Sequence, residues 1–383
     1  MSKARLCALE VVLAEIGIGI VGGGYMGKAH AVAMAAVGAV FNTTLRPRLE
    51  TLCTTTEAGA KAKAQQFGFA RSTADWRVLV DDPKVQAVVI ASPQDTHYEI
   101  ALAAFARGKH VFCEKPLGLN IAQSRDMLAA AEKSGCIHMT GFNYIRTPAS
   151  QLARQIIANG EIGDITFFRG EHTEDFLADA MIPANWRTEG RPNGNMGDLS
   201  PHIINAAFAL AGPITSVMAE IETVYKTRPS AQGPVAVTND DQALIMCRFA
   251  NGSLGSLYIS RVALGRKMGY AYEITGTKGA IRFDQEDQNA IWLYKADQAP
   301  NRQGFTKILT GPTHPDYEPF CLGPGHGTGY QDQITIEAKD FLEAIANGKP
   351  KWPTFKDGMA VNQLIEAAWL SSEKRSWVKV SDI

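Results

Sequence analysis

The chain has 383 residues, of which 45% are apolar and 20% are charged, a composition typical of a globular protein with about two domains. Its formal net charge of −1 gives no field that favours nucleic acid or an anionic membrane, and no basic stripe is present. No apolar run approaches the roughly 20 residues that are needed to span a bilayer. These properties exclude nucleic-acid-binding and membrane-spanning proteins and predict small-molecule partners.

Residues 1–14 precede the first predicted strand and are interpreted as an N-terminal extension. Lys3 and Arg5 precede an apolar patch as in a signal peptide, but Glu10 interrupts this patch and no small-residue cleavage site follows. The six cysteines are far apart and form no C-x-x-C pair, so they predict neither a zinc ribbon nor a redox motif. We therefore expect a cytoplasmic protein that binds no metal.

Residues 15–146 alternate strand-like and helix-like patterns. Strands are predicted at 16–21, 49–54, 85–91, 109–113 and 137–142, and helices at 26–37, 56–68, 96–108 and 122–135. Strands that alternate with helices of this length form βαβ units. This part of the chain is predicted to be a Rossmann domain with a parallel sheet.

A glycine-rich loop follows the first strand. Gly22, Gly24 and Gly27 form the pattern G-x-G-x-x-G between this strand and a helix, which is the context of a dinucleotide-binding loop. Gly22 permits the tight turn, Gly24 leaves room for the pyrophosphate, and Gly27 allows close packing of helix and strand. The helix N-terminus offers free N–H groups to the phosphates. We expect this loop, including Tyr25 and Met26, to bind NAD or NADP.

The end of the second strand helps to separate NAD from NADP, because an acidic residue there binds the ribose 2′-hydroxyl of NAD. Thr54 occupies this position and tolerates a 2′-phosphate. No arginine is adjacent to hold that phosphate, and Lys61 and Lys63 lie further along the helix. Glu57 is an alternative, displaced acid, although its position suits a solvated residue of the first helical turn. The cofactor is therefore NAD or NADP, with a slight lean to NADP.

A lysine stands at the edge of the sheet where ligands of open α/β domains bind, beyond the carboxyl ends of the strands. Lys115 directly follows the fourth strand and precedes Pro116, which stiffens the backbone. Position alone also suits an ordinary surface lysine. Further residues expected to contact the cofactor, with Lys115 itself, are Ser92, Pro93, His97, Glu114 and Asn143.

Residues 147–383 follow a different pattern. Helices are predicted at 148–159, 199–211, 331–347 and 356–374, and strands at 164–172, 214–227, 240–250, 252–263, 270–275, 280–283 and 290–294. Glycine and asparagine turns separate several strands, as in antiparallel meanders. The pattern predicts a substrate-binding and oligomerisation domain: an α/β domain on an open, mostly antiparallel sheet, whose C-terminal helix packs back on the Rossmann domain.

One strand of this second sheet carries apolar residues on both faces, in the stretch GSLGSLYISRVAL. An exposed apolar area of that size usually marks an interface. We therefore expect a homodimer or a homotetramer that forms through this sheet.

The stretch GDLSPH places Asp198 just before a predicted helix and His202 four residues later. At this spacing both side chains face the same way on a helix. Asp198 is also a suitable N-cap, and Pro201 is tolerated in the first turn. A capping aspartate explains Asp198 alone, whereas an ionisable histidine on the same face indicates chemistry.

These motifs together resemble the glucose–fructose oxidoreductase/inositol dehydrogenase (Gfo/Idh/MocA) family. The motifs GGGYMG, CEKPLG, GFNYIRTPA and GDLSPH occur in the family's order, and the similarity runs from about residue 15 to the C-terminus. The resemblance implies that Lys115, Asp198 and His202 converge on the substrate and that the bond before Pro116 is cis. The family often has TPN where this chain has SPQ, which leaves the contact of Gln94 open.

The resemblance implies an NAD(P)-dependent oxidoreductase that moves a hydride between the nicotinamide and a hydroxyl-bearing carbon of a sugar, anhydrosugar or inositol-like polyol. Lys115 is expected to stabilise the developing alkoxide, His202 to take the hydroxyl proton, and Asp198 to orient His202. The oxidation rate is expected to rise with pH as His202 loses its proton. The expected substrate-binding residues are Lys115, Tyr144, Arg146, His172, Trp186, Arg187, Asp198, His202 and His326.

Two other functions are compatible with these residues. Some relatives hydrolyse glycosides through a transient oxidation and keep NAD bound, so that cleavage of a glycoside produces no net NADH. A sensor or repressor binds nucleotide and sugar without chemistry, but it has no need of Lys115 and His202 together.

Overall fold

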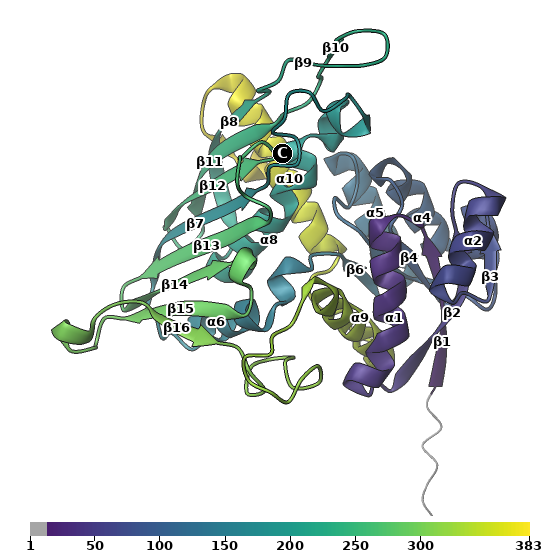
Figure 1. Cartoon of the computed structure of the whole chain (residues 1–383), viewed down its shortest axis with the longest axis horizontal. Helices are drawn as coiled ribbons and strands as arrows, with labels where there is room; N and C mark the ends of the chain where they lie inside the picture. Colours follow the sequence, from purple (N-terminus) through teal and green to yellow (C-terminus); the bar gives the residue numbers. More distant parts are fainter. Residues whose placement is uncertain (1–13) are drawn as a thin grey trace, which may run out of the picture.

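The computed structural model describes residues 14–383, and residues 1–13 of the predicted extension lie outside the described residues. The chain folds into two α/β units that lie side by side (Figure 1). Within the described range, no helix combines the length and the apolar character that crossing a bilayer requires.

The first unit is a parallel sheet in the order β3-β2-β1-β4-β5-β6. Its strands are β1 (Ala14–Val21), β2 (Leu45–Cys53), β3 (Arg71–Thr73), β4 (Ala87–Ile90), β5 (His110–Cys113) and β6 (His138–Thr140). The helices between them are α1 (Tyr25–Phe41), α2 (Glu57–Phe67), α3 (Trp76–Asp81), α4 (His97–Ala106) and α5 (Ile121–Ser134). The predicted Rossmann fold is confirmed. The elements of this unit that were not predicted are the short β3 and α3 and the 3₁₀ turns Gln94–Thr96 and Tyr144–Arg146.

The second unit is a nine-stranded sheet in the order β16-β15-β14-β13-β7-β12-β11-β8-β17. Its strands are β7 (Ile165–Thr173), β8 (Ile214–Glu222), β11 (Gln242–Phe249), β12 (Leu254–Ser260), β13 (Gly269–Gly276), β14 (Gly279–Asp284), β15 (Ala290–Lys295), β16 (Thr306–Leu309) and β17 (Val378–Lys379). The pair β7–β12 is parallel and the other neighbouring pairs are antiparallel, which confirms the predicted mostly antiparallel sheet.

Helices cover one face of this sheet and leave the other bare in Figure 1. The helices that follow β6 in the chain are α6 (Pro148–Ala158), α7 (Asn195–Asp198), α8 (Ser200–Ala211), α9 (Tyr330–Asn347) and α10 (Phe355–Lys374). Of these, α9 lies beside α1 of the first unit (Figure 1). Alternation along the strands directs one side chain inward and the next outward, and the outward face carries exposed apolar residues. These are Phe167, Leu244, Met246, Leu254 and Tyr258.

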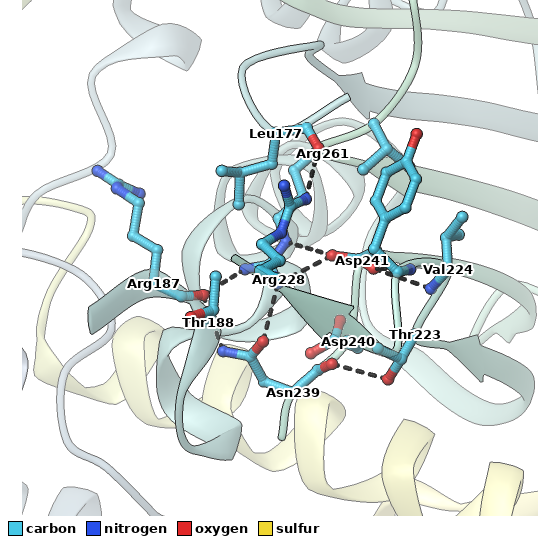
Figure 2. Close-up of polar contacts among 12 residues, drawn as sticks. Leu177, Arg187, Thr188, Thr223, Val224, Arg228, Asn239, Asp240, Asp241 and Arg261 are labelled. Atoms are coloured by element: carbon cyan, nitrogen blue, oxygen red, sulfur yellow. Dashed lines mark hydrogen bonds and ion pairs between the residues drawn. The ribbon is translucent and has the colours of Figure 1, made fainter. Parts of the chain in front are cut away.

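The predicted strand at 214–227 is shorter in the structure than expected. It ends at Glu222, and a separate strand β9 (Thr227–Arg228) pairs with β10 (Val235–Ala236). The carboxylate of Asp241 accepts hydrogen bonds from the backbone N–H groups of Val224 and Tyr225 at 2.8 and 3.0 Å, as Figure 2 shows for Val224. The N–H groups of Val224 and Tyr225 thus bond a side chain instead of a neighbouring strand, and the backbone leaves the sheet after Glu222.

Both C-terminal helices pack on the Rossmann unit. On α9, Ile334, Ala338 and Phe341 belong to the buried apolar cluster that also contains Ile18 and Met34 of the Rossmann domain. The α10 helix begins at Phe355 in a Rossmann cluster and continues with Val361 and Leu364 in the core of the second unit. The α10 helix therefore joins the two units by apolar packing, whereas the apolar residues of α9 pack on the Rossmann unit.

Replacement of Phe341 by alanine tests this packing. Phe341 is fully buried and its ring contacts that of Phe112 on β5, with centroids 5.8 Å apart. Phe341→Ala is expected to lower the free energy of unfolding by about 3–5 kcal/mol, measured by urea denaturation. Leu309→Ala is the control, because Leu309 is 58% exposed and its loss is expected to change stability by less than about 0.5 kcal/mol. Equal effects of the two changes would contradict a shared core.

Candidate functional site

The glycine loop after β1 fits the pyrophosphate of a dinucleotide. Gly22 has a φ of 109°, a backbone conformation that favours glycine. A Cβ on Gly27 would lie 2.0 Å from the carbonyl oxygen of Gly22, so the helix and the strand pack too closely for a side chain. A Cβ on Gly24 would meet no atom within 4 Å, which leaves open space where the phosphates are expected. No side chain caps α1, so its first N–H groups remain available to a ligand.

The ribose end of this loop contains a lysine that sequence analysis placed further away. Nζ of Lys63 donates to the carbonyl oxygen of Gly23 at 2.5 Å, and the aliphatic part of Lys63 lies beside Gly23 together with Thr54. The hydroxyl of Thr54 donates to the carbonyl of Thr56 at 3.3 Å. The carboxylate of Glu57 accepts from the backbone N–H of Ala74 at 3.0 Å, which assigns it to bracing a loop.

Lys115 and Asp198 meet at the junction of the two units. Lys115 follows β5 in a turn with a cis bond to Pro116, as expected, and Asp198 ends α7. The ammonium Nζ of Lys115 donates to Oδ1 of Asp198 at 2.9 Å and to its backbone carbonyl at 2.6 Å. The guanidinium of Arg187 contacts the other carboxylate oxygen of Asp198. Burial raises the pKa of Asp198, whereas the charges of Lys115 and Arg187 lower it by more. The resulting pKa is about 2, so the carboxyl group is an anion.

His202 lies in the first turn of α8 among aromatic rings. The centroid of its ring is 4.5 Å from that of Tyr144 and 5.6 Å from that of His172. Its Nδ1 is buried and has no hydrogen-bond partner among residues 14–383. Burial, and then the charges of Lys115 and His172, hold the pKa of His202 well below its usual range. The imidazole is therefore neutral at pH 7 and able to accept a proton.

Two expectations for Asp198 were wrong. The N-cap of α8 is Leu199 and no side chain caps this helix. The carboxylate of Asp198 binds Lys115 and Arg187, and no hydrogen bond joins it to His202 in the described part of the chain. An i, i+4 spacing places two side chains on one face only within one continuous helix, whereas α7 ends at Asp198 and α8 begins at Ser200.

Three residues that were expected to contact the cofactor have other partners. The two ring nitrogens of His97 lie 3.0 Å from the carbonyl oxygen of Pro116 and 3.1 Å from that of Ser92. Oε1 of Glu114 lies 2.7 Å from Nε2 of His30 on α1. The side chain of Asn143 donates to Oε1 of Gln333 at 3.0 Å. These buried side chains brace the cofactor edge from behind, and strand position alone does not reveal which way they point.

Two residues that were expected to bind the substrate are also buried away from solvent. Arg146 is 3% exposed, pairs with Asp340 on α9 and donates to the carbonyl of Trp352 at 2.9 Å. His172 is 1% exposed, and Nδ1 lies 2.8 Å from the carbonyl oxygen of Leu199. Their polar atoms are directed into the protein, and direct contact with a substrate stays a prediction for both.

The remaining predicted residues differ in their surroundings. Ser92 and Pro93 stay at the sheet edge, where the Ser92 hydroxyl pairs with that of Thr96 at 2.6 Å. Trp186 is 61% exposed, and the guanidinium carbon of Arg187 lies 4.4 Å from the centre of its ring. His326 is exposed and contacts Cys321 of its own loop, with Nδ1 3.3 Å from Sγ, so the structure does not bring it to Lys115.

Tyr330 was not predicted from the sequence, and the contact of Gln94 was left open. Tyr330, at the start of α9, stacks on Tyr25 with centroids 5.7 Å apart and donates to Sδ of Met26 at 3.2 Å. The amide of Gln94 donates to the carbonyl of Pro192 at 2.9 Å, which resolves its open contact as one between the two units. Both contacts join segments far apart in the chain. The aromatic residue that follows the glycines of GPGHGTGY was the available signal for Tyr330.

Comparison with family models covers most of the chain. Residues 16–142 match the model described as "Oxidoreductase family, NAD-binding Rossmann fold", and residues 150–282 match the "GFO/IDH/MocA C-terminal domain". The first of these models names NAD, so the lean towards NADP gains no support from it.

Several curated proteins resemble the chain over almost its whole length. A levoglucosan dehydrogenase of Pseudarthrobacter phenanthrenivorans is 39% identical, with 96% of this chain and 99% of the relative covered. A myo-inositol 2-dehydrogenase of Thermotoga maritima is 27% identical, again with 96% and 99% covered. These matches confirm the predicted class, an NAD-dependent sugar or polyol dehydrogenase.

Solved structures agree with this assignment. A levoglucosan dehydrogenase in complex with NADH and levoglucosan is 39% identical and superposes with a TM-score of 0.93, with 96% of this chain and 99% of the other covered. An oxidoreductase domain protein from Kribbella flavida is 37% identical and has a TM-score of 0.92, with 96% and 99% covered. The fold, both family models and these relatives agree that the chain belongs to the Gfo/Idh/MocA family of NAD-binding oxidoreductases.

Proposed function

We propose that this chain oxidises a hydroxyl group of an anhydrosugar such as levoglucosan and that Lys115 and His202 carry the chemistry. The observation that supports this most is the meeting of Lys115 from the Rossmann unit with Asp198 and Arg187 from the second unit, next to a neutral histidine. The similarity to a levoglucosan dehydrogenase supports the substrate class.

Lys115 acts as a cation in this proposal. Asp198 is ionised and fixes the ammonium group in place, so that a remaining N–H points to the oxygen of the substrate hydroxyl. The lysine donates a charge-assisted hydrogen bond that strengthens as negative charge develops on this oxygen. Asp198 is thus a positioning residue for Lys115. The sequence had instead led us to expect that Asp198 orients His202.

His202 takes the hydroxyl proton. A histidine is a base only in its neutral form, and burial keeps His202 in that form at pH 7. Tyr144 packs on its ring, with centroids 4.5 Å apart, and so restricts its orientation. When bound, NAD supplies the nicotinamide that accepts the hydride. Gly22, Gly24 and Gly27 would hold its pyrophosphate.

The mouth of the site suits a sugar ring. Trp186 is 61% exposed and offers an aromatic face to ring C–H groups, and Arg187 offers N–H donors to hydroxyl oxygens. The side chain of Arg187 is 36% exposed while it binds Asp198, so part of its fork faces solvent.

The oxidation itself is tested with a panel of sugars and polyols and NAD, read as absorbance of NADH. Levoglucosan is expected to give net NADH. Lys115→Ala and His202→Ala are each expected to lower kcat by roughly 10²–10⁴-fold, because each removes a group that acts on the proton or the developing charge. Cleavage of a nitrophenyl glycoside without net NADH would instead support the hydrolase. A His202→Ala variant that retains most of its kcat would remove His202 from the mechanism.

The pH profile gives a second, independent reading of His202. The pKa of His202 is lowered, so the neutral base is present throughout the neutral range and is lost only as pH falls through this lowered pKa. The rate of oxidation is therefore expected to be flat near pH 7 and to fall on the acid side of about 6.5, the ordinary pKa of histidine. The rate is therefore expected to rise with pH only in the acid range, where His202 loses its proton.

The coenzyme site is tested by Gly24→Val. A branched side chain there would occupy the open space above the loop, where a Cβ meets no atom within 4 Å, so the fold is expected to survive and the affinity for NADH to fall. Fluorescence titration with NADH measures this affinity. Gly304→Ala is a control away from the loop, because a Cβ on Gly304 would meet no atom within 4 Å and its φ is not positive. Unchanged NADH affinity in Gly24→Val would contradict the assignment of the loop.

We also propose that the chain forms a homodimer or homotetramer through the bare face of the second sheet. Leu244 and Tyr258 are paired across β11 and β12 on this face, and Phe167 is paired with Leu254 across β7 and β12. Side chains of this kind, 37–52% exposed, form a contiguous apolar strip over three strands.

The cytoplasmic location remains a prediction from cysteine usage.

Light scattering at micromolar concentration tests the assembly. The wild type is expected to have two or four times the mass of one chain, and Leu244→Lys is expected to dissociate it, because a charge would be buried in the interface. Leu264→Lys is the matched control, since Leu264 is 83% exposed but lies outside the strip. A monomeric wild type would refute this interface.

A further inference from the structure

A buried cluster of polar side chains lies under the segment that carries Arg187 and Asp198. The cluster consists of Asn239, Asp240, Asp241 and Arg261, on or next to the adjacent strands β11 and β12 (Figure 2). All four residues are at most 3% exposed. The proposed chemistry uses none of them.

The segment above the cluster, residues 186–198, has little regular structure of its own. It contains only the short 3₁₀ turns Trp186–Thr188 and Arg191–Asn193 and the four-residue helix α7. Such short elements satisfy few of their own backbone groups, so the position of the segment depends on outside partners.

Arg261 and Asn239 hold the first part of this segment. The guanidinium of Arg261 donates to the carbonyl oxygens of Arg187 at 2.7 Å and Asn193 at 3.3 Å, and it pairs with Asp241 at 2.9 Å. The amide of Asn239 donates to the carbonyls of Arg187 at 2.9 Å and Gly190 at 3.2 Å. Figure 2 shows that the backbone oxygen of Arg187 faces the cluster while its side chain points away.

Asp240 holds the second part. Its carboxylate oxygen Oδ2 accepts the N–H of Met196 at 2.7 Å, and its backbone carbonyl accepts the N–H of Asn195 at 3.0 Å. The segment fits closely here, because a Cβ on Gly194 would lie 2.0 Å from Oδ1 of Asp240. Two of the N–H groups in the turn that ends at Asp198 are therefore fixed by one residue.

We propose that Asp240, Asn239 and Arg261 are positioning residues that set the geometry of the Arg187–Asp198–Lys115 contact. The inference rests on the proposed roles of Arg187 and Asp198. The cluster contacts the backbone at both ends of the segment, so it fixes the spacing of these two side chains without touching the substrate. Asp241 completes the cluster by neutralising Arg261 and by holding the backbone at Val224.

The test combines hydrogen exchange with kinetics in the full chain. Asp240→Ala removes the partner of Met196, and Gly194→Ala forces the segment away from Asp240 without removing a polar group. Both are expected to speed backbone exchange in peptides from residues 186–198, measured by mass spectrometry. Both are also expected to lower kcat/KM for levoglucosan on the order of 10- to 100-fold, as expected when a charge-assisted contact is misplaced. The NADH affinity is expected to stay within about twofold, since the glycine loop that is expected to bind the coenzyme belongs to the other unit.

The controls separate positioning from general stability. Asp240→Asn keeps an acceptor for Met196 and is expected to restore most of kcat/KM. Ser371→Ala removes a fully buried hydroxyl that bonds the N–H of Ala219 at 3.0 Å, away from the segment, and is expected to lower the melting temperature without changing KM. If Asp240→Ala does not fold, Asn239→Ala takes its place with the same expected results.

Each outcome bears on the proposal. Unchanged exchange at 186–198 in the folded variants overturns it, whatever the activity. Faster exchange with wild-type kcat and KM also overturns it, because the segment would then move without consequence for the reaction. An inactive wild type that binds NADH contradicts the proposed function instead, and the exchange result still decides whether the cluster positions the segment.

Discussion

The ion pair between Lys115 and Asp198 is the contact on which the site depends. Its cation belongs to the turn after β5 and its anion to the end of α7, so the pair exists only when the two units are packed together. A partly buried carboxylate stays ionised at little cost only with cations beside it, and Lys115 and Arg187 supply two. The same charges that fix Lys115 thus tie the geometry of the candidate site to the arrangement of the units.

The candidate site has a charged side and a buried aromatic side. Lys115, Arg187 and Asp198 form the charged side, whereas His202 lies among the rings of Tyr144, Phe142 and His172. Burial there removes the charge of His202, and the nearby lysine lowers the pKa further. A cation and a neutral base next to one another are what the oxidation of an alcohol requires, because one stabilises the oxygen and the other takes its proton.

Patterns local in sequence predicted the fold and part of the site. Strand–helix alternation and the glycine loop depend on neighbouring residues, so the Rossmann sheet and its cofactor edge were predictable. The prediction of side-chain contacts failed where a side chain binds partners that are distant in the sequence. Arg146 pairs with Asp340, and His97 contacts the carbonyl oxygens of Pro116 and Ser92. These contacts depend on tertiary packing. Asp198 was found, but its partner was assigned wrongly because a break between α7 and α8 is not visible in the motif.

The position of α9 has a consequence for how the chain is made. Ile334, Ala338 and Phe341 fill the core beneath β1 and α1, yet they lie about 300 residues after those elements. While a ribosome produces the chain from its N-terminus, the Rossmann sheet therefore remains without one of its apolar layers until α9 has emerged. A fragment that stops at the end of β6 would expose this surface to solvent and to other chains. The Rossmann unit can thus complete its core only after the second unit has been synthesised.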